Sequence, residues 1–158
     1  MANPIPKFGL ESLAQVRASG VEQLLRQHWR EVAHFTDIPL DPDWDAYQGV
    51  ENVGRLRIFT VRIDDELVGY AAYFINRNPH YRSSLQAVQD VLFLAPEHRK
   101  FRIGYRLIMF ADTHLAAEGV QAVYQHSKVK KELDMGPLLA RQGYELIDTL
   151  WAKRLDRG

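Results

Sequence analysis

The stretch from Val91 to Leu107 constrains the fold of this chain more than any other part of the sequence. Its apolar start predicts a strand, Pro96 marks a turn, and a helical pattern opens at Ile103 after a basic loop. The first N–H groups of a helix have no partner inside the helix, and the helix dipole favours an anion beside them. The loop therefore predicts a phosphate or pyrophosphate site, with a solvated basic surface as the alternative. The cations around it are Arg99, Lys100, Arg102 and Arg106.

Helical patterns fill the N-terminal part of the chain. Apolar residues recur at helical spacing over residues 10–36, and Gly20 is expected to separate a short helix from a longer one. Ser19 and Glu22 have the spacing of a capping box at the start of the longer helix. A further short helix is expected over residues 41–47, because aspartate followed by proline suits an N-cap and the first helical position.

The middle of the chain changes to the two-residue period of strands. Residues 56–63 alternate like a strand rich in β-branched and aromatic side chains, and residues 68–75 return as its partner across the polar turn 64–66. A loop is expected over residues 76–84 and a third strand over residues 85–94. These patterns predict an antiparallel hairpin extended by one more strand.

The last third of the chain continues the alternation of helices and strands. The helix that opens at Ile103 is expected to end at Gly119, before a short strand over residues 120–125. A brief helix over residues 135–142 and a final extended strand over residues 144–155 complete the order. The whole order predicts an α/β fold with a mixed, mostly antiparallel central sheet flanked by helices.

Length and composition favour one domain over residues 1–158, with a helical part over 10–50 and a sheet core over 55–155. Lys and Arg balance Asp and Glu at 20 each, which argues against a nucleic-acid partner because such domains are usually basic. The chain has no cysteine, no signal-like N-terminus and no apolar run of membrane-spanning length, so we expect a cytoplasmic protein without a membrane partner. Its 6 histidines lack metal-ligand spacing, and we expect no metal.

The loop and the order of elements together resemble the GCN5-related N-acetyltransferase (GNAT) family over residues 55–155. The family's Arg/Gln-x-x-Gly-x-Gly/Ala signature stands here at residues 99–104, and its common Gly-Phe pair stands as Gly143-Tyr144. Two positions depart from the family pattern. Arg102 replaces the first glycine of the signature, and Leu139 stands where many members have a tyrosine that protonates the departing thiolate.

The resemblance implies an enzyme that moves the acetyl group of acetyl-CoA to a primary amine of a small molecule or a peptide, without a metal. The N–H groups of residues 101–104 would bind the pyrophosphate. The strand ending at Leu94 would separate from the strand near Tyr124 and pair with the pantetheine arm, and the N–H of Leu92 would polarise the acetyl carbonyl. The resemblance also allows a homodimer. The residues it assigns to the donor are Leu92, Phe93, Leu94, Arg99, Lys100, Phe101, Arg102, Ile103, Gly104 and Tyr105.

The acceptor amine must lose a proton before it attacks, because lysine-like amines have pKa values near ~10.4. Asp90 lies two residues before Leu92, and a regular strand would place both side chains on one face. Asp90 is therefore the leading candidate for the base, acting through a water. Tyr124 and His126, on or just after the next strand, are the other candidates for acid or base. Asp90 could instead form a structural ion pair with an arginine such as Arg57.

Two other functions stay open at this point. A protein of the same fold that binds a partner without catalysis would explain the departures at Arg102 and Leu139. A different acyl donor is the third alternative, since a fold does not fix an activity. The acceptor itself cannot be chosen from the sequence, although Trp44 and Tyr47 fall in a segment that often covers the acceptor in this family.

Overall fold

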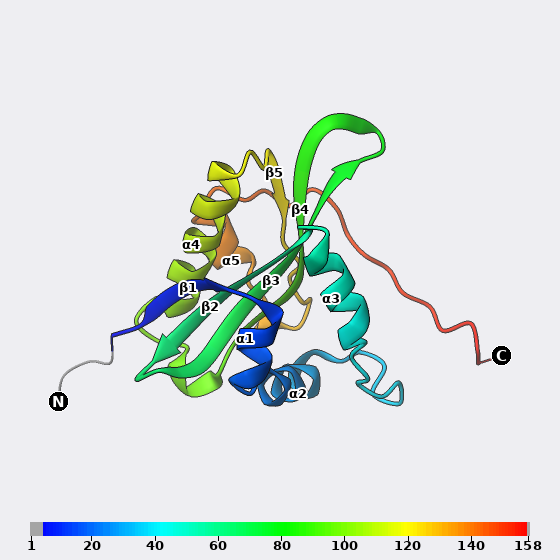
Figure 1. Cartoon of the computed structure of the whole chain (residues 1–158). Coiled ribbons are helices and arrows are strands. Elements are labelled where there is room, and N and C mark those ends of the chain that lie inside the picture. Colours follow the sequence, from blue (N-terminus) through cyan, green and yellow to red (C-terminus); the bar gives the residue numbers. More distant parts are fainter. Residues whose placement is uncertain (1–4, 158) are drawn as a thin grey trace. The chain divides into compact units, whose positions relative to one another are not determined.

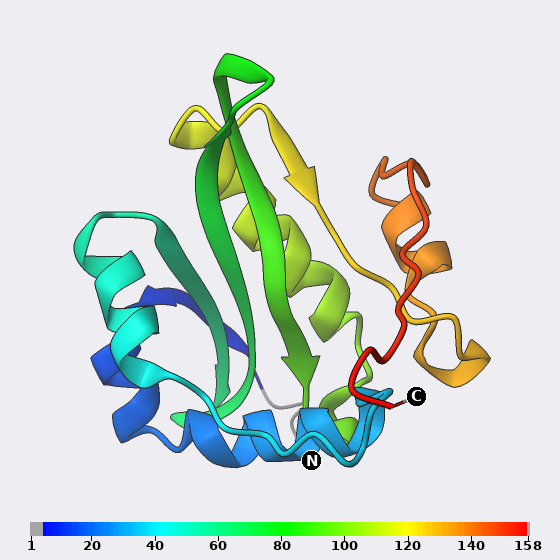
Figure 2. The same cartoon turned by 90° about the vertical axis from the view of Figure 1, so that its right-hand side faces the viewer.

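The structure of the chain, a computed structural model, describes residues 5–157 and contains two compact units, which meet in sequence between His126 and Ser127. The first unit is a sheet with helices on both faces (Figure 1, Figure 2). The second unit holds two short helical segments and an irregular C-terminal stretch. The predicted α/β class with a mixed, mostly antiparallel sheet is confirmed.

The strands of the described chain form one sheet in the order β1-β2-β3-β4-β5. Their bounds are Lys7–Glu11, Leu56–Ile63, Glu66–Asn78, Tyr81–Leu94 and Ala122–Tyr124. Neighbours from β1 to β4 are antiparallel, and β5 runs parallel to β4. The β2–β3 hairpin turns at Asp64 and Asp65, whose φ angles of 50° and 65° suit a tight turn that matches the twist of its strands.

Helices cover both faces of this sheet. The helices of the first unit are α1 (Leu13–Ala18), α2 (Val21–Val32), α3 (Trp44–Asn52) and α4 (Ile103–Ala117). Side chains of α1, α2 and α3 form one core with Tyr70 and Phe93, and side chains of α4 form a second core with Phe59 and Tyr73. Because both faces are covered, β2 and residues 67–75 of β3 are almost continuously buried.

Two features of the N-terminal part differ from the prediction. Residues 7–11 form β1 at the edge of the sheet, so the predicted helical stretch begins too early. A strand of this length is too short to show its period against the helix that follows. The capping box belongs to α1, where Ser12 and Gln15 bind each other's backbone N–H groups, and not to Ser19 and Glu22.

The boundaries of the next two helices have clear causes. Gly20 separates α1 from α2 as predicted, at a φ of 83° that suits glycine. Helix α3 begins at Trp44, because the side chain of Asp43 accepts a hydrogen bond from the N–H of Ala46 at 2.9 Å. The predicted start at residues 41–42 is therefore wrong.

Two predictions for later segments are also wrong. Strand β3 continues to Asn78 and β4 starts at Tyr81, so most of the loop predicted over residues 76–84 is a hairpin. The final strand predicted over residues 144–155 does not form, because a strand needs a paired neighbour and the described part of the second unit has none. The brief helix predicted there is present as α5, Gly136–Ala140.

Candidate active site

Strand β4 carries a bulge at Asp90, the residue that the sequence favours as the base. Ala72 pairs with Val91 and Tyr73 pairs with Gln89, so Asp90 has no partner residue on β3. A bulge of this kind bends the strand and re-aims a side chain. Val91 lies in the core beneath α1, α2 and α3, and Asp90 contacts α3 as well, so two consecutive side chains point to the same face.

The bulge also separates the side chains of Asp90 and Leu92. Leu92 packs against the core beneath α4, on the opposite face of the sheet. The expectation that both side chains share one face is therefore wrong, because the extra residue shifts the alternation of the strand. The role considered for Leu92 uses its backbone N–H and does not depend on its side chain.

Asp90 is a half-buried carboxylate with one bonded oxygen. Tyr47 on α3 donates a hydrogen bond from its hydroxyl to Oδ2 of Asp90 at 2.6 Å, and among the described residues no hydrogen bond reaches Oδ1. Burial raises the pKa of Asp90 above its ordinary value, while the hydrogen bond from Tyr47 and the nearby His126 oppose that shift. Burial, and then Asp90, raise the pKa of Tyr47, so the phenol keeps the proton that it donates.

Strands β4 and β5 separate toward the C-terminal end of β4 (Figure 2). Their parallel pairing ends where Val88 meets Tyr124. Beyond that point a side chain replaces the backbone pairing. Oε1 of Gln89 accepts a hydrogen bond from the N–H of His126 at 2.8 Å. The edge of β4 from residue 89 to residue 94 has no strand partner on this side within the described chain. The predicted splayed strand pair is confirmed.

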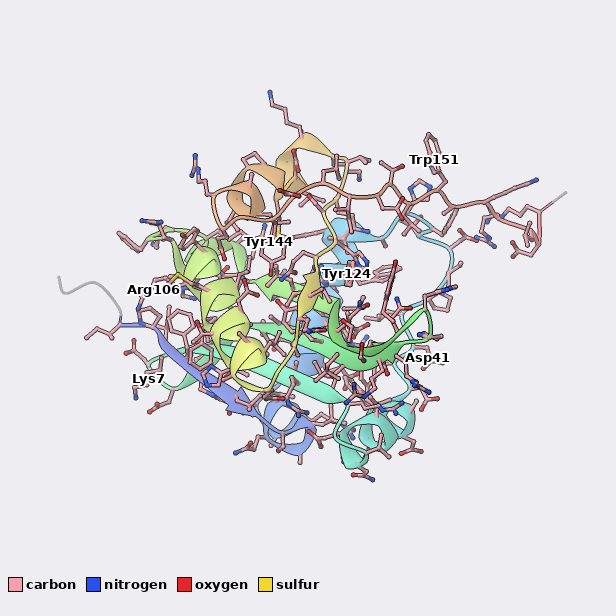
Figure 3. All side chains as sticks on the ribbon, turned by 90° about the horizontal axis from the view of Figure 1, so that it is seen from above. Lys7, Asp41, Arg106, Tyr124, Tyr144 and Trp151 are labelled. Atoms are coloured by element: carbon pink, nitrogen blue, oxygen red, sulfur yellow. The ribbon has the colours of Figure 1, made fainter. Side chains whose placement is uncertain are left out.

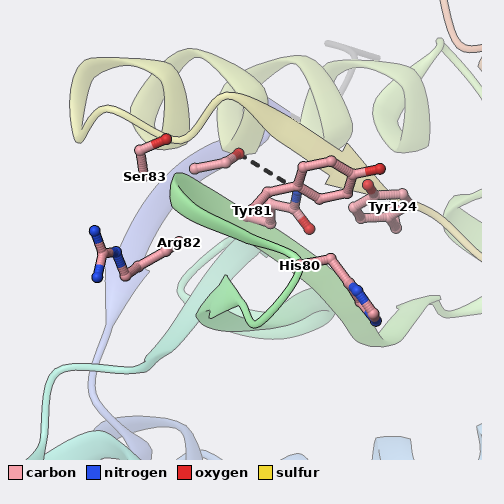
Figure 4. Close-up of a pocket in the computed structure, with 7 residues that line it drawn as sticks. His80, Tyr81, Arg82, Ser83 and Tyr124 are labelled. Carbon is pink, nitrogen blue, oxygen red and sulfur yellow. Dashed lines mark hydrogen bonds between the residues drawn. The ribbon is translucent and has the colours of Figure 1, made fainter.

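Tyr124 and His126 both lie near the bulge. Tyr124 pairs with Val88, two residues before Asp90, so its side chain shares the face of Asp90. It lines an open pocket together with buried Gln86 and the tip of the β3–β4 hairpin, residues 80–84 (Figure 4). His126 is close enough to favour the ionised form of Asp90. The structure thus brings the three candidate catalytic residues to one region.

The loop after β4 leaves several backbone donors without a partner. It passes through a short 3-10 turn, Pro96–His98, and then through Phe101 and Arg102, whose φ angles of 54° and 58° are left-handed. The N–H of Ile103 donates to the carbonyl oxygen of Lys100. Among the described residues, the N–H groups of Phe101, Arg102 and Gly104 make no hydrogen bond. Of the four N–H groups expected to be free at the start of α4, those of residues 101–104, three have no partner, and that of Ile103 is already bonded.

The cations of this loop have different surroundings. Arg99 is held in place, because its Nε donates to the carbonyl of Leu94 at 2.8 Å and its Nη2 lies 2.6 Å from the carboxylate of Glu31 on α2. Arg102 lies with its guanidinium 4.4 Å from the ring centre of Tyr105. No ion pair within the described chain involves Lys100, Arg102 or Arg106, which lies on α4 (Figure 3).

Sequence reasoning missed three residues that shape this region. The sequence suggested Tyr47 only as a residue near the acceptor, and it gave no sign of a role for Gln89 or Glu31. A contact such as that between Glu31 and Arg99 joins residues 68 positions apart, and no local pattern signals it. No group of His, Asp and Glu side chains suited to a metal occurs among the described residues. No helix in the described part of the chain is long and apolar enough to cross a membrane.

Comparison with known families decides the relationship. The model of the Acetyltransferase (GNAT) family matches residues 20–144, which is most of the chain. The chain belongs to this family. Arg102, which the sequence resemblance placed at a signature glycine, has a left-handed conformation that favours glycine, and Leu139 is buried.

Solved structures of acetyltransferases share this GNAT fold. Glucosamine-6-phosphate N-acetyltransferase from Arabidopsis thaliana is 14% identical, with a TM-score of 0.71 over 95% of this chain and 99% of that one. Ribosomal-protein-alanine N-acetyltransferase from Brucella melitensis is 16% identical, with a TM-score of 0.69 over 96% and 99%. An aminoglycoside N-acetyltransferase in complex with CoA is 15% identical, with a TM-score of 0.73 over 97% and 96%. A comparison with curated proteins returned no match.

Proposed function

We propose that this GNAT protein is a cytoplasmic N-acetyltransferase that moves the acetyl group of acetyl-CoA to a primary amine of a small molecule or a peptide. The observation that carries the proposal is the set of unpartnered N–H groups at the start of α4, next to the open edge of β4. Amide donors at a helix start suit a pyrophosphate, and an open strand edge suits an amide-rich arm. A structural neighbour in complex with CoA supports the same donor.

The proposed donor site uses the backbone more than the side chains. The N–H groups of Phe101, Arg102 and Gly104 bind the pyrophosphate, and Lys100, Arg102 and Arg106 add positive charge. Leu92, Phe93 and Leu94 offer their open edge to the pantetheine arm. Ile103 and Tyr105 begin the helix that presents these donors, and Ile103 is anchored in the core beneath α4. Arg99 holds the loop on α2 and is not a direct phosphate ligand in this proposal.

The proposed reaction needs a base, an oxyanion donor and an acid. Asp90 accepts a proton from the acceptor ammonium, directly or through water, and the free amine attacks the acetyl carbon. The N–H of Leu92 stabilises the negative charge on the carbonyl oxygen. When the tetrahedral intermediate collapses, the carbonyl re-forms and the carbon–sulfur bond breaks. The former amine nitrogen gives its second proton to solvent, and the departing CoA thiolate takes a proton from Tyr124, His126 or solvent. The raised pKa of Asp90 suits the role of base, because a base works best when its pKa approaches the working pH.

Activity can be tested by thiol release from acetyl-CoA in the presence of a panel of amines. The panel consists of kanamycin, glucosamine 6-phosphate and a short peptide with an N-terminal alanine. Asp90→Asn should lower kcat by about 100-fold or more while leaving CoA affinity unchanged by calorimetry. The matched control is Asp64→Asn, the same substitution in an exposed hairpin turn at a φ of 50°. Equal activities of the two variants would remove Asp90 from the proposal.

A second candidate is a protein that binds CoA without catalysis. The buried Leu139 favours this candidate. It stands where many family members have a tyrosine that protonates the departing thiolate, and a leucine side chain cannot donate that proton. Thermal stabilisation by CoA without turnover on any amine would support this candidate. Turnover would exclude it, and the absence of both effects would contradict both functions.

A further inference from the structure

Tyr47 contacts the carboxylate of Asp90 and two aromatic rings. Its ring stacks on Phe74 of β3, with ring centres 6.0 Å apart and planes at 23°, and Trp44 lies 5.8 Å away on its own helix. Residues three positions apart on a helix share a face, so Trp44 and Tyr47 present one aromatic surface to the sheet. With its ring enclosed in this way, the hydroxyl of Tyr47 meets Oδ2 of Asp90 at 2.6 Å.

This contact fixes one oxygen of the carboxylate and leaves the other available. Oδ2 is occupied by the phenol, and within the described chain Oδ1 accepts no hydrogen bond. The bulge turns the side chain of Asp90 toward α3, and there the hydrogen bond from Tyr47 holds the carboxylate. We infer that Tyr47 is a positioning residue, which holds Oδ2 of Asp90 so that Oδ1 faces the amine to be deprotonated. The inference rests on the function proposed above.

The same contact also affects the pKa of the base. Within residues 5–157, the titratable groups that interact with Asp90 are Tyr47 from α3, Tyr70 from β3 and His126 after β5. The hydrogen bond from Tyr47 favours the ionised carboxylate and counteracts part of the effect of burial on the pKa of Asp90. Loss of the phenol should therefore raise the pKa of Asp90 further. Since only the ionised carboxylate accepts a proton, the acid limb of the rate profile should move to higher pH.

The test is Tyr47→Phe, which keeps the ring between Trp44 and Phe74 and removes only the hydroxyl. For whichever amine of the panel is the best acceptor, kcat/KM at neutral pH should fall about ten-fold, the cost expected for one hydrogen bond to a charged group. The acid limb should move up by about one pH unit, and the KM for acetyl-CoA should not change. Carbon NMR of the side-chain carboxyls, with Asp90 assigned from Asp90→Asn, should show the same shift without any substrate.

The matched control is Tyr73→Phe. Tyr73 is another buried phenol on β3, but it accepts a hydrogen bond from Gln125 at 2.7 Å and lies in the core beneath α4. Removal of the Tyr73 hydroxyl should leave the acid limb of the rate profile at the pH of the parent. Thermal unfolding of both variants shows whether a fall in rate reflects loss of folded protein.

The outcomes separate the inference from the proposed function. Movement of the acid limb and of the Asp90 titration in Tyr47→Phe, but not in Tyr73→Phe, supports the positioning role. An active parent whose acid limb stays in place in Tyr47→Phe overturns the inference and leaves the enzyme intact. A parent that acetylates none of the amines overturns the proposed function, and the positioning role falls with it even where the carboxyl titration moves.

Discussion

Arg102 holds a backbone conformation that its side chain disfavours, and the cost can be measured as a difference in the free energy of unfolding between variants. Its φ and ψ of 58° and 26° are left-handed, a region that costs a residue with a Cβ about 1–2 kcal/mol. Glycine avoids this cost but loses about 0.5–1 kcal/mol through the greater freedom of the unfolded chain. The contact of the guanidinium with Tyr105, at 4.4 Å, contributes about 0.5–1 kcal/mol at an exposed site.

These magnitudes predict an order for two substitutions. Arg102→Ala loses the ring contact and keeps the backbone cost, so its free energy of unfolding should fall by about 0.5–1 kcal/mol. Arg102→Gly loses the same contact but escapes the backbone cost, so it should be about 0.5–1 kcal/mol more stable than the alanine variant and close to the parent. Urea unfolding followed by circular dichroism measures the difference. An alanine variant as stable as the glycine variant would refute the left-handed conformation at this position.

Three other substitutions test separate parts of the structure. Glu31→Gln frees Arg99 and should weaken CoA binding roughly threefold by calorimetry, a size that suits a partly exposed ion pair. Gly69→Ala places a Cβ 2.8 Å from a carbonyl oxygen of β4 and should lower the free energy of unfolding by about 1–3 kcal/mol in urea. Asp90→Asn removes a carboxyl whose pKa is raised by folding, so the parent should lose stability relative to the variant as the pH rises from the unfolded pKa through the folded one.

Matched variants make these results interpretable. Glu22→Gln breaks an exposed ion pair with Arg26 on the same helix as Glu31 and should leave CoA affinity unchanged. Gly49→Ala adds a Cβ that meets nothing within 4 Å and should stabilise α3 by about 0.5–1 kcal/mol. Equal effects within either pair, or a pH-independent difference between Asp90→Asn and the parent, would contradict the corresponding reasoning.

The sequence could predict the elements that have a strong local signal. The strand that ends at Leu94 and the helix that opens at Ile103 appear as expected, because an apolar run and a helical apolar face are both local patterns. The prediction of the N-terminal helix boundaries was wrong for a local reason too. Ser12 and Ser19 both have side chains that can cap a helix, and only the folded backbone selects one of them. The prediction of a strand over residues 144–155 was wrong because a strand needs a paired neighbour, and the sequence does not specify one.

The candidate site was predictable in part. Asp90, Tyr124 and His126 stood out because of their places on or after neighbouring strands, and the structure brings them to one region. The bulge at Asp90 was not predictable, since it arises from the register between β3 and β4 and not from a marker residue. The partner Tyr47 lies 43 positions from Asp90, and only the packing of α3 on the sheet brings them together.

The account depends most on the binding of the donor pyrophosphate by the backbone of the loop before α4, and a proton–nitrogen NMR titration with CoA tests this directly. We predict that the amide resonances of Phe101, Arg102 and Gly104 shift saturably and together, because these N–H groups have no hydrogen bond inside the described chain. They should shift in the same way in Arg102→Gly, where the guanidinium is gone. Saturation of CoA binding with those three amides unmoved would contradict the account.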